Sequence, residues 1–183
     1  MRNIALVLCL LVLAAPAGAT RIGIYDSPAA GSCSLNRFES GPLVSVYIIE
    51  TQSTGSTGAS FRVDADLPGL MTDIGWTWLG GICVGNCNPY EGASVGRACS
   101  TDDWVMYRLD FLSDLDTRGT GCNHLNIVGF PSDNVLVYDC NDQGLPFTGG
   151  YFSFTDGVTA CDDCSPPLPV TPTTWGRVKS LYR

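Results

Sequence analysis

The sequence has 183 residues, with 18 acidic and 10 basic side chains, one histidine and a formal net charge of −8. This length suits one domain with a real hydrophobic core, and the acidic balance argues against nucleic acid or an anionic membrane as a partner. We interpret the charge as solubility outside the cell, with a cation-binding surface as the alternative.

The beginning of the chain has the features of a secretory signal peptide. Arg2 is followed by an unbroken apolar run over 4–15, and residues 17–19, Ala-Gly-Ala, supply the small-x-small pattern of a cleavage site. The run is about a dozen residues long, whereas a membrane-spanning helix needs about 20. We therefore predict that 1–19 is a signal peptide. The mature protein would be secreted, extracellular or periplasmic, with retention at the cell surface left open.

Strand signals dominate the rest of the chain. Short segments that alternate apolar and polar residues, or that are rich in Val, Ile, Tyr and Phe, are separated by turn-forming residues. Helical periodicity is absent until the very end. About seven or eight such strands indicate an all-β fold, and we predict an immunoglobulin-like β-sandwich domain over 20–164. The predicted strands are 21–25, 43–49, 60–63, 104–111, 125–128, 135–138 and 151–154.

A proline-rich segment separates this domain from a basic, aromatic tail. Residues 165–174 contain four prolines and are predicted to form an extended spacer. Residues 175–183 are predicted as a short helix capped by Thr174 or as an extended tail, and so short a helix is marginal on its own. The tail is either a sorting or anchoring signal, or a segment that docks on its own acidic domain. Its candidate recognition residues are Trp175, Arg177, Lys179, Leu181, Tyr182 and Arg183.

The cysteines indicate a disulfide framework. Nine are present, and removal of Cys9 with the signal peptide leaves an even number, as an oxidising compartment favours. The strands on either side of Pro131 are predicted to form a hairpin, which would place Cys122 opposite Cys140 at a distance suited to a disulfide. The remaining pairs are expected to be Cys83–Cys87, Cys161–Cys164 and, by elimination, Cys33–Cys99.

A zinc site is the alternative for four of these cysteines. The spacing of Cys83, Cys87, Cys161 and Cys164 fits a four-thiolate site. The oxidising compartment argues against it. A redox motif is also disfavoured, because the two aspartates between the last two thiols would raise their pKa.

The sequence contains no recognisable catalytic constellation. His124 is the only histidine, and no Gly-x-Ser-x-Gly elbow supplies a nucleophile. Neighbouring carboxylates such as Asp102 and Asp103 fall on opposite faces of a strand, so their adjacency is not evidence for a catalytic pair. We therefore predict no enzymatic activity, no catalytic residue and no cofactor.

Two loops partly match oxygen-ligand calcium sites. Segments 139–144 and 114–119 have oxygen donors at positions one and three and glycine at position six, but both lack the acidic ligand at position twelve. Asp, Asn and Gly are also ordinary turn formers, so we predict no metal and keep these loops as secondary calcium candidates. The ligands would be Asp139 and Asn141 in one loop, and Asp114 and Asp116 in the other.

Trp76 and Trp78 are a candidate aromatic platform. They lie two residues apart, so on a strand they would share one face. An exposed face would offer aromatic rings on which sugars stack, whereas a buried face would belong to the core.

Several segments resemble a group of uncharacterised secreted bacterial β-rich proteins. They are 22–25 (Ile-Gly-Ile-Tyr), 44–47 (Val-Ser-Val-Tyr), 137–141 (Val-Tyr-Asp-Cys-Asn) and the closing Trp-Gly-x-x-Lys-x-Leu-Tyr-Arg of 175–183. The resemblance implies export and a β-rich domain. It implies no activity and no catalytic residue.

Two hypotheses from different classes follow. The preferred one is a secreted non-enzymatic β-sandwich module with a binding or structural role at the cell surface or in the extracellular matrix. Its partner would be an extracellular protein or polysaccharide, with no nucleic acid and no membrane span. The alternative is a carbohydrate-binding protein or a hydrolase that acts on an extracellular polymer.

Overall fold

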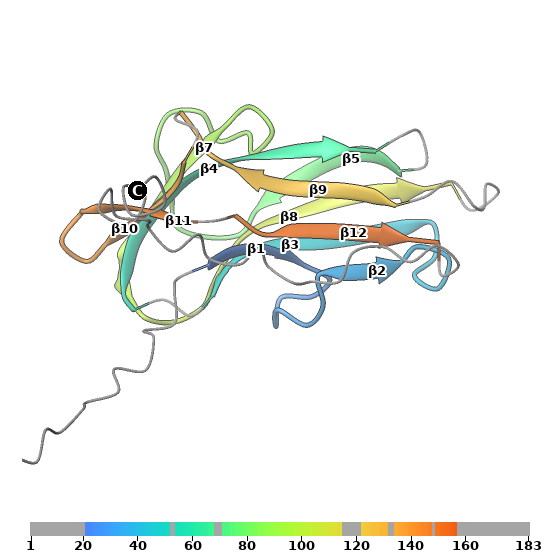
Figure 1. Cartoon of the computed structure of the whole chain (residues 1–183), viewed down its shortest axis with the longest axis horizontal. Helices are drawn as coiled ribbons and strands as arrows, with labels where there is room; N and C mark the ends of the chain where they lie inside the picture. Colours follow the sequence, from blue (N-terminus) through green and yellow to red (C-terminus); the bar gives the residue numbers. More distant parts are fainter. Residues whose placement is uncertain are drawn as a thin grey trace, which may run out of the picture.

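Figure 1 shows a computed structural model of the chain, which describes residues 21–51, 54–67, 71–114, 122–131, 134–147 and 149–156. Within these ranges the protein is all-β, with twelve strands and no helix. The described residues therefore contain no helix long and apolar enough to span a membrane. The predicted β-sandwich class is confirmed, with more strands than the seven or eight expected. The predicted signal peptide, the Pro-rich spacer, the C-terminal tail, and Cys161 with Cys164 lie outside the described residues.

The twelve strands vary in length, and several of the shorter ones were not predicted. In chain order they are β1 (Arg21–Tyr25), β2 (Ser34–Asn36), β3 (Leu43–Thr51), β4 (Ser56–Asp66), β5 (Met71–Trp78), β6 (Ile82–Cys83), β7 (Ala93–Ser100), β8 (Trp104–Ser113), β9 (Asn123–Val128), β10 (Val135–Asp139), β11 (Gly144–Phe147) and β12 (Tyr151–Thr155).

The strands form two sheets that pack face to face (Figure 1). The smaller sheet has the order β1-β3-β8-β5, and the larger one has the order β11-β10-β4-β9-β12-β2. β7 pairs with β4 in the larger sheet, and β6 pairs with β7. Among the described strands β2 and β12 form the one parallel pair. The larger sheet is therefore arranged around β4, which has three partners.

The core lies between the two sheets and follows from the period-two alternation of the strands. Val44, Val46 and Ile48 of β3 are buried in alternation with more exposed neighbours. Aromatic rings join the sheets, for example Phe111 of β8 and Phe154 of β12, whose centroids are 5.3 Å apart.

The predicted hairpin around Pro131 is wrong. β9 and β10 are both antiparallel to β4, so they run in the same direction and cannot form a hairpin with each other. Val128 at the end of β9 is opposite Arg62, and Leu136 in β10 is opposite Ser60. The two strands therefore follow one another along β4, and the turn between them returns the chain to the same strand.

This arrangement also corrects two predicted disulfides. Cys140, at the far end of β10, is bonded to Cys99, and their Cα atoms are 5.2 Å apart. The pairs Cys122–Cys140 and Cys33–Cys99 are therefore wrong, although Cys33 and Cys122 are each disulfide-bonded. The small loop closed by Cys83 and Cys87 is confirmed.

A buried ion pair joins the two sheets at one end. The Glu50 carboxylate, at the end of β3, is fully buried, and its Oε2 lies 3.6 Å from Nη2 of Arg97 in β7. The Ser56 hydroxyl, at the start of β4, donates to Glu50 Oε2 and accepts from Arg97 Nη2, both at 2.9 Å. The Arg97 guanidinium also lies 4.9 Å from the centre of the Trp104 ring. One cluster thus fixes β3 and β8 against β4 and β7.

Replacing Arg97 with Met should lower the free energy of unfolding by about 3–5 kcal/mol, because Glu50 would stay buried without its counter-charge. Urea denaturation measures this change. Arg62→Met is the matched control, since it removes an exposed ion pair with Asp64 and should have little effect. The double variant Glu50→Leu/Arg97→Met should recover much of the loss; equal losses in Arg97→Met and Arg62→Met would contradict the account.

Peptide mapping of the unreduced protein should recover Cys99 linked to Cys140 and Cys83 linked to Cys87. Loss of the longer bridge in Cys99→Ser/Cys140→Ser should lower the free energy of unfolding by about 4 kcal/mol, because it closes a long loop in the unfolded chain. A fragment that joins Cys122 to Cys140 would refute the observed order of β9 and β10.

Candidate functional site

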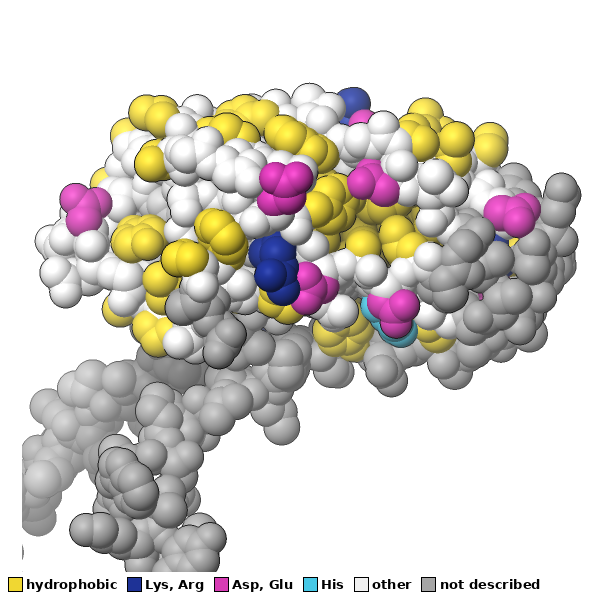
Figure 2. Space-filling view, turned by 90° about the horizontal axis from the view of Figure 1, so that it is seen from above, with side chains coloured by type: hydrophobic (Ala, Val, Ile, Leu, Met, Phe, Trp, Pro, Cys, Tyr) yellow, Lys and Arg dark blue, Asp and Glu magenta, His cyan; other side chains and the backbone are white. Residues whose placement is uncertain are grey.

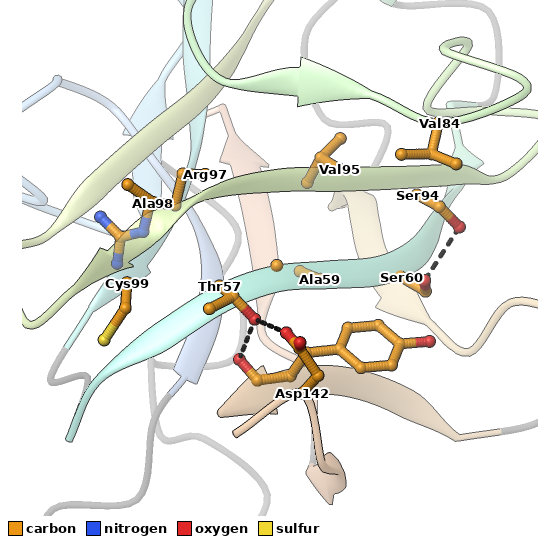
Figure 3. A pocket seen from close by; sticks show the side chains of 12 residues that line it. Thr57, Ala59, Ser60, Val84, Ser94, Val95, Arg97, Ala98, Cys99 and Asp142 are labelled. Atoms are coloured by element: carbon orange, nitrogen blue, oxygen red, sulfur yellow. Dashed lines mark hydrogen bonds between the residues drawn. The ribbon is translucent and has the colours of Figure 1, made fainter. Parts of the chain in front are cut away.

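A groove runs over the outer face of the larger sheet, along β4 and β7, with a volume of about 590 Å³. We call it the β4–β7 groove (Figure 3). The inward-facing residues of these strands, such as Phe61 and Val95, belong to the core. Alternation along the strands therefore turns Ser60 and Ser94 outward.

The floor of the groove consists of small residues from two paired strands. Gly58 is opposite Gly96, and Ser60 is opposite Ser94. The two serine hydroxyls lie 2.9 Å apart and hydrogen-bond each other, as the dashed line in Figure 3 marks. A Cβ at Gly58 would lie 2.5 Å from the Val95 carbonyl oxygen, so only glycine fits there, whereas a Cβ at Gly96 has its nearest neighbour at 3.4 Å.

Larger side chains flank this floor on both sides. On one side Tyr138 of β10 is opposite Gly58, and Leu136 is opposite Ser60. On the other side Ile82 of β6 is opposite Gly96, and the Val84 N–H donates to the Ser94 carbonyl. Ile82 and Val84 are 68% and 65% exposed. Of these four side chains, Tyr138 and Val84 line the groove itself, so it is a shallow channel with one large apolar or aromatic wall residue on each side.

Polar groups close one end of the groove. The Thr57 hydroxyl donates to Asp142 Oδ1 and to the Asp139 carbonyl oxygen, both at 3.0 Å. Asp139 Oδ1 accepts hydrogen bonds from the N–H groups of Gln143 and Asn141, both at 2.8 Å. These two bonds hold the pKa of the Asp139 carboxyl below its usual range.

The first calcium candidate, the loop of Asp139 and Asn141, is held together by its own hydrogen bonds. The carboxylate of Asp139 stabilises its own turn, and within the described ranges no three His, Cys, Asp or Glu side chains come together in one cluster. Asp116 lies outside the described residues, so the second loop is not tested. The four-thiolate zinc site is wrong, because Cys83 and Cys87 are bonded to each other.

Asp139→Ala should destabilise the protein near neutral pH, with a difference from the wild type that shrinks in acid. A depressed pKa means that the ionised carboxylate is favoured in the folded state, so its contribution is present above the ordinary Asp value of about 3.9 and is lost as the pH falls through the folded value. Urea denaturation across this range checks the sign. Asp139→Asn, which keeps an oxygen acceptor, should lose less, and a pH-independent difference would argue against this role.

The candidate aromatic platform of Trp76 and Trp78 packs against the core. Trp76 and Trp78 do share one face of β5, but it is the inward face. Their ring centroids lie 5.9 and 5.3 Å from that of Tyr107, and both contacts are edge to face. Both tryptophans are half-buried against the core. The Tyr107 hydroxyl donates to the Cys87 carbonyl at 3.1 Å, and burial raises the pKa of Tyr107.

His124 has a structural partner. Its Nδ1 lies 3.1 Å from the Ser153 hydroxyl. Ser153 is fully buried, so its hydroxyl cannot reach a substrate as a nucleophile would. The contact between His124 and Ser153 is therefore structural.

The groove was not predicted from the sequence, because β6 and β7 lack clear strand signals. β7 is rich in Ala, Gly and Ser and has a single β-branched residue, Val95, so it lacks the composition expected of a strand. The signal that could have found it is the alternation of small residues at 94, 96 and 98, which resembles one face of a strand.

No protein-family model matches the chain, and no curated protein matches it. Solved structures with a similar arrangement of strands include several cohesin modules. The sixth cohesin of scaffoldin B from Acetivibrio cellulolyticus, solved with a mutant Cel5 dockerin, is 12% identical with a TM-score of 0.49 over 74% of this chain and 97% of that one. A cohesin module of a family 33 glycoside hydrolase from Clostridium perfringens is 6% identical, with a TM-score of 0.49 over 74% and 95%. Similarities at this level carry no conclusion about what this chain binds.

Proposed function

We propose that this protein is a secreted, non-catalytic binding module, and that its ligand is an extended segment of a partner protein held in the β4–β7 groove. The observation that carries the proposal is the floor of small residues between two apolar walls. Such a channel accommodates a chain and offers apolar contact on both sides.

The exposure of the walls supports a protein ligand. Val84, which lines the groove, and Ile82, two residues before it, are each about two-thirds exposed, and grouped exposed apolar side chains commonly mark protein interaction sites. The hydroxyls of Ser60 and Ser94 hydrogen-bond each other. The floor therefore offers a ligand a fitting shape but little charge. Sugar recognition would be favoured by several aromatic faces, and among the side chains that line the groove Tyr138 is the one aromatic.

The non-catalytic part of the proposal is supported by the chemistry of the site. The Asp139 carboxylate is held by backbone N–H groups, and Arg97, at the inner side of the groove, is engaged with Ser56 and Glu50. Neither residue is positioned as an acid, a base or a nucleophile toward the groove. Secretion is supported by the predicted signal peptide and by the disulfides, since these form and persist in oxidising compartments.

Gly96→Val tests the proposal, because it fills the floor at a position with room for a side chain. A random peptide library displayed on phage is selected on the mature wild-type protein, and the selected peptides are measured against variants. Gly96→Val should weaken their binding at least about tenfold, about 1.4 kcal/mol. Thr72→Val, an exposed strand position on β5, is the matched control and should leave binding unchanged.

Two results would overturn the proposal. One is that the selected peptides bind Gly96→Val as tightly as the wild type while the variant keeps its unfolding midpoint. The other is that soluble oligosaccharides such as cellohexaose or chitohexaose bind, and lose binding in Gly96→Val, while no peptide is enriched. That second result would establish the carbohydrate-binding alternative.

A further inference from the structure

Among the described strands, none joins β4 to β5 on one side of the sandwich. The Val63 N–H donates to the Pro89 carbonyl at 2.8 Å, and beyond this point no described segment pairs with that edge of β4, whose other edge is covered by β9. β5 pairs with β8, and its second edge has no described partner strand. Seen from above, the surface is hollowed, with hydrophobic side chains inside and acidic side chains around them (Figure 2). We call this feature the β4–β5 hollow.

The hollow combines apolar walls with a negative rim. Half-buried apolar side chains from β5, from the residue that follows β4 and from the loop before β7 pack against the core here. They are Leu67, Trp76 and Tyr90. The exposed acidic residues of the same segments are Asp64, Asp66, Asp73 and Glu91.

The negative charge of this rim is largely uncompensated. Asp64 pairs with Arg62 at 2.8 Å, whereas within the described residues no Lys, Arg or His lies at ion-pair distance from Asp66 or Asp73. Burial and the nearby Asp73 carboxylate raise the pKa of the Tyr90 hydroxyl. The hollow therefore suits a ligand that carries apolar side chains together with positive charge.

We propose that the basic, aromatic C-terminal segment of this same chain, residues 174–183, docks in the β4–β5 hollow. The last cations of the sequence, Arg177, Lys179 and Arg183, all lie in this segment. The helix predicted from its sequence would place Trp175 and Val178 on one face, to fill the hollow, with the cations near the acidic rim. A helix this short is marginal in water, so docking would also be the source of its order.

The described chain ends close to the hollow. Asp156 follows β12, which pairs with β9, and β9 pairs with β4, where His124 is opposite Asp66. Two strand spacings of about 4.8 Å separate β12 from β4. An extended chain covers about 3.3 Å per residue, so residues 157–173 are long enough to carry the tail across.

Trypsin cleavage of the full mature chain tests this proposal, because docking hides the bonds after Arg177 and Lys179. Intact mass spectrometry follows the rate at which the tail is lost. Asp66→Asn/Asp73→Asn removes rim charge without changing side-chain shape, and it should speed tail cleavage about tenfold, because cleavage follows the undocked population. Added salt should speed cleavage of the wild type by screening the same attraction.

The control variant is Asp26→Asn/Glu39→Gln. It removes the same charge next to β1 and β2, strands at the edges of the two sheets away from the hollow, and should leave the rate unchanged. The indole NMR signal of Trp175, assigned with Trp175→Phe, should move in the rim variant and not in the control.

Three results would overturn the proposal. Equal cleavage rates in all variants would show that the tail is not protected by the rim. Equal acceleration by both variants would make the effect one of net charge. Protection that disappears on dilution would place the tail on a second copy of the chain. None of these depends on the β4–β7 groove, so the proposed binding function stands or falls separately.

Discussion

The pairing of strand β4 is the constraint on which the rest of the structure depends. Its first half is held on both edges, by β7 on one side and β10 on the other. Its second half is held by β9, and its other edge is free of described strands beyond Val63. The first half produces a continuous outer surface with a groove, and the second half leaves one side of the sandwich without a described partner strand. Both candidate binding surfaces thus arise from the register of one strand.

Two links hold the first half of β4 in place among its neighbouring strands. The Glu50–Arg97 ion pair fixes the start of β4 and β7 against the smaller sheet, and the Cys99–Cys140 bridge joins the ends of β7 and β10. A buried ion pair contributes little net stability by itself, but it strongly penalises arrangements that separate its partners. The floor and one wall of the groove are therefore fixed relative to one another before any ligand binds, which lowers the ordering cost of binding.

The sequence predicted those parts of the fold that are encoded by local composition. The segments 21–25, 43–49, 104–111 and 151–154 correspond to β1, β3, β8 and β12, because β-branched and aromatic residues alternate there. β7 was not predicted, because its glycine and serine residues are not typical of strands. They matter here for the space that they leave in the groove. The hairpin around Pro131 failed for a different reason. A turn between two apolar runs does not show whether the runs pair with each other or with a third strand, and here both pair with β4.

The contrast between local composition, which the sequence shows, and long-range pairing, which it does not, applies to the candidate site as well. Trp76 and Trp78 share one face, as their spacing predicts, but whether that face points inward depends on the opposing sheet. The groove could not be predicted at all, because its residues come from four separate segments whose proximity depends on long-range pairing. Its residues are also small, and small residues carry no chemical signal of their own.

The most direct test of this account is a set of cross-strand nuclear Overhauser effects in the oxidised mature protein. The account predicts contacts between Arg62 and Val128, between Ser60 and Leu136, and between Ala59 and Val95 in the same molecule. These would establish that β9 and β10 follow one another along β4 while β7 occupies its other edge. Contacts that join 125–128 to 135–138 as a hairpin would contradict the account and remove the basis of both the groove and the hollow.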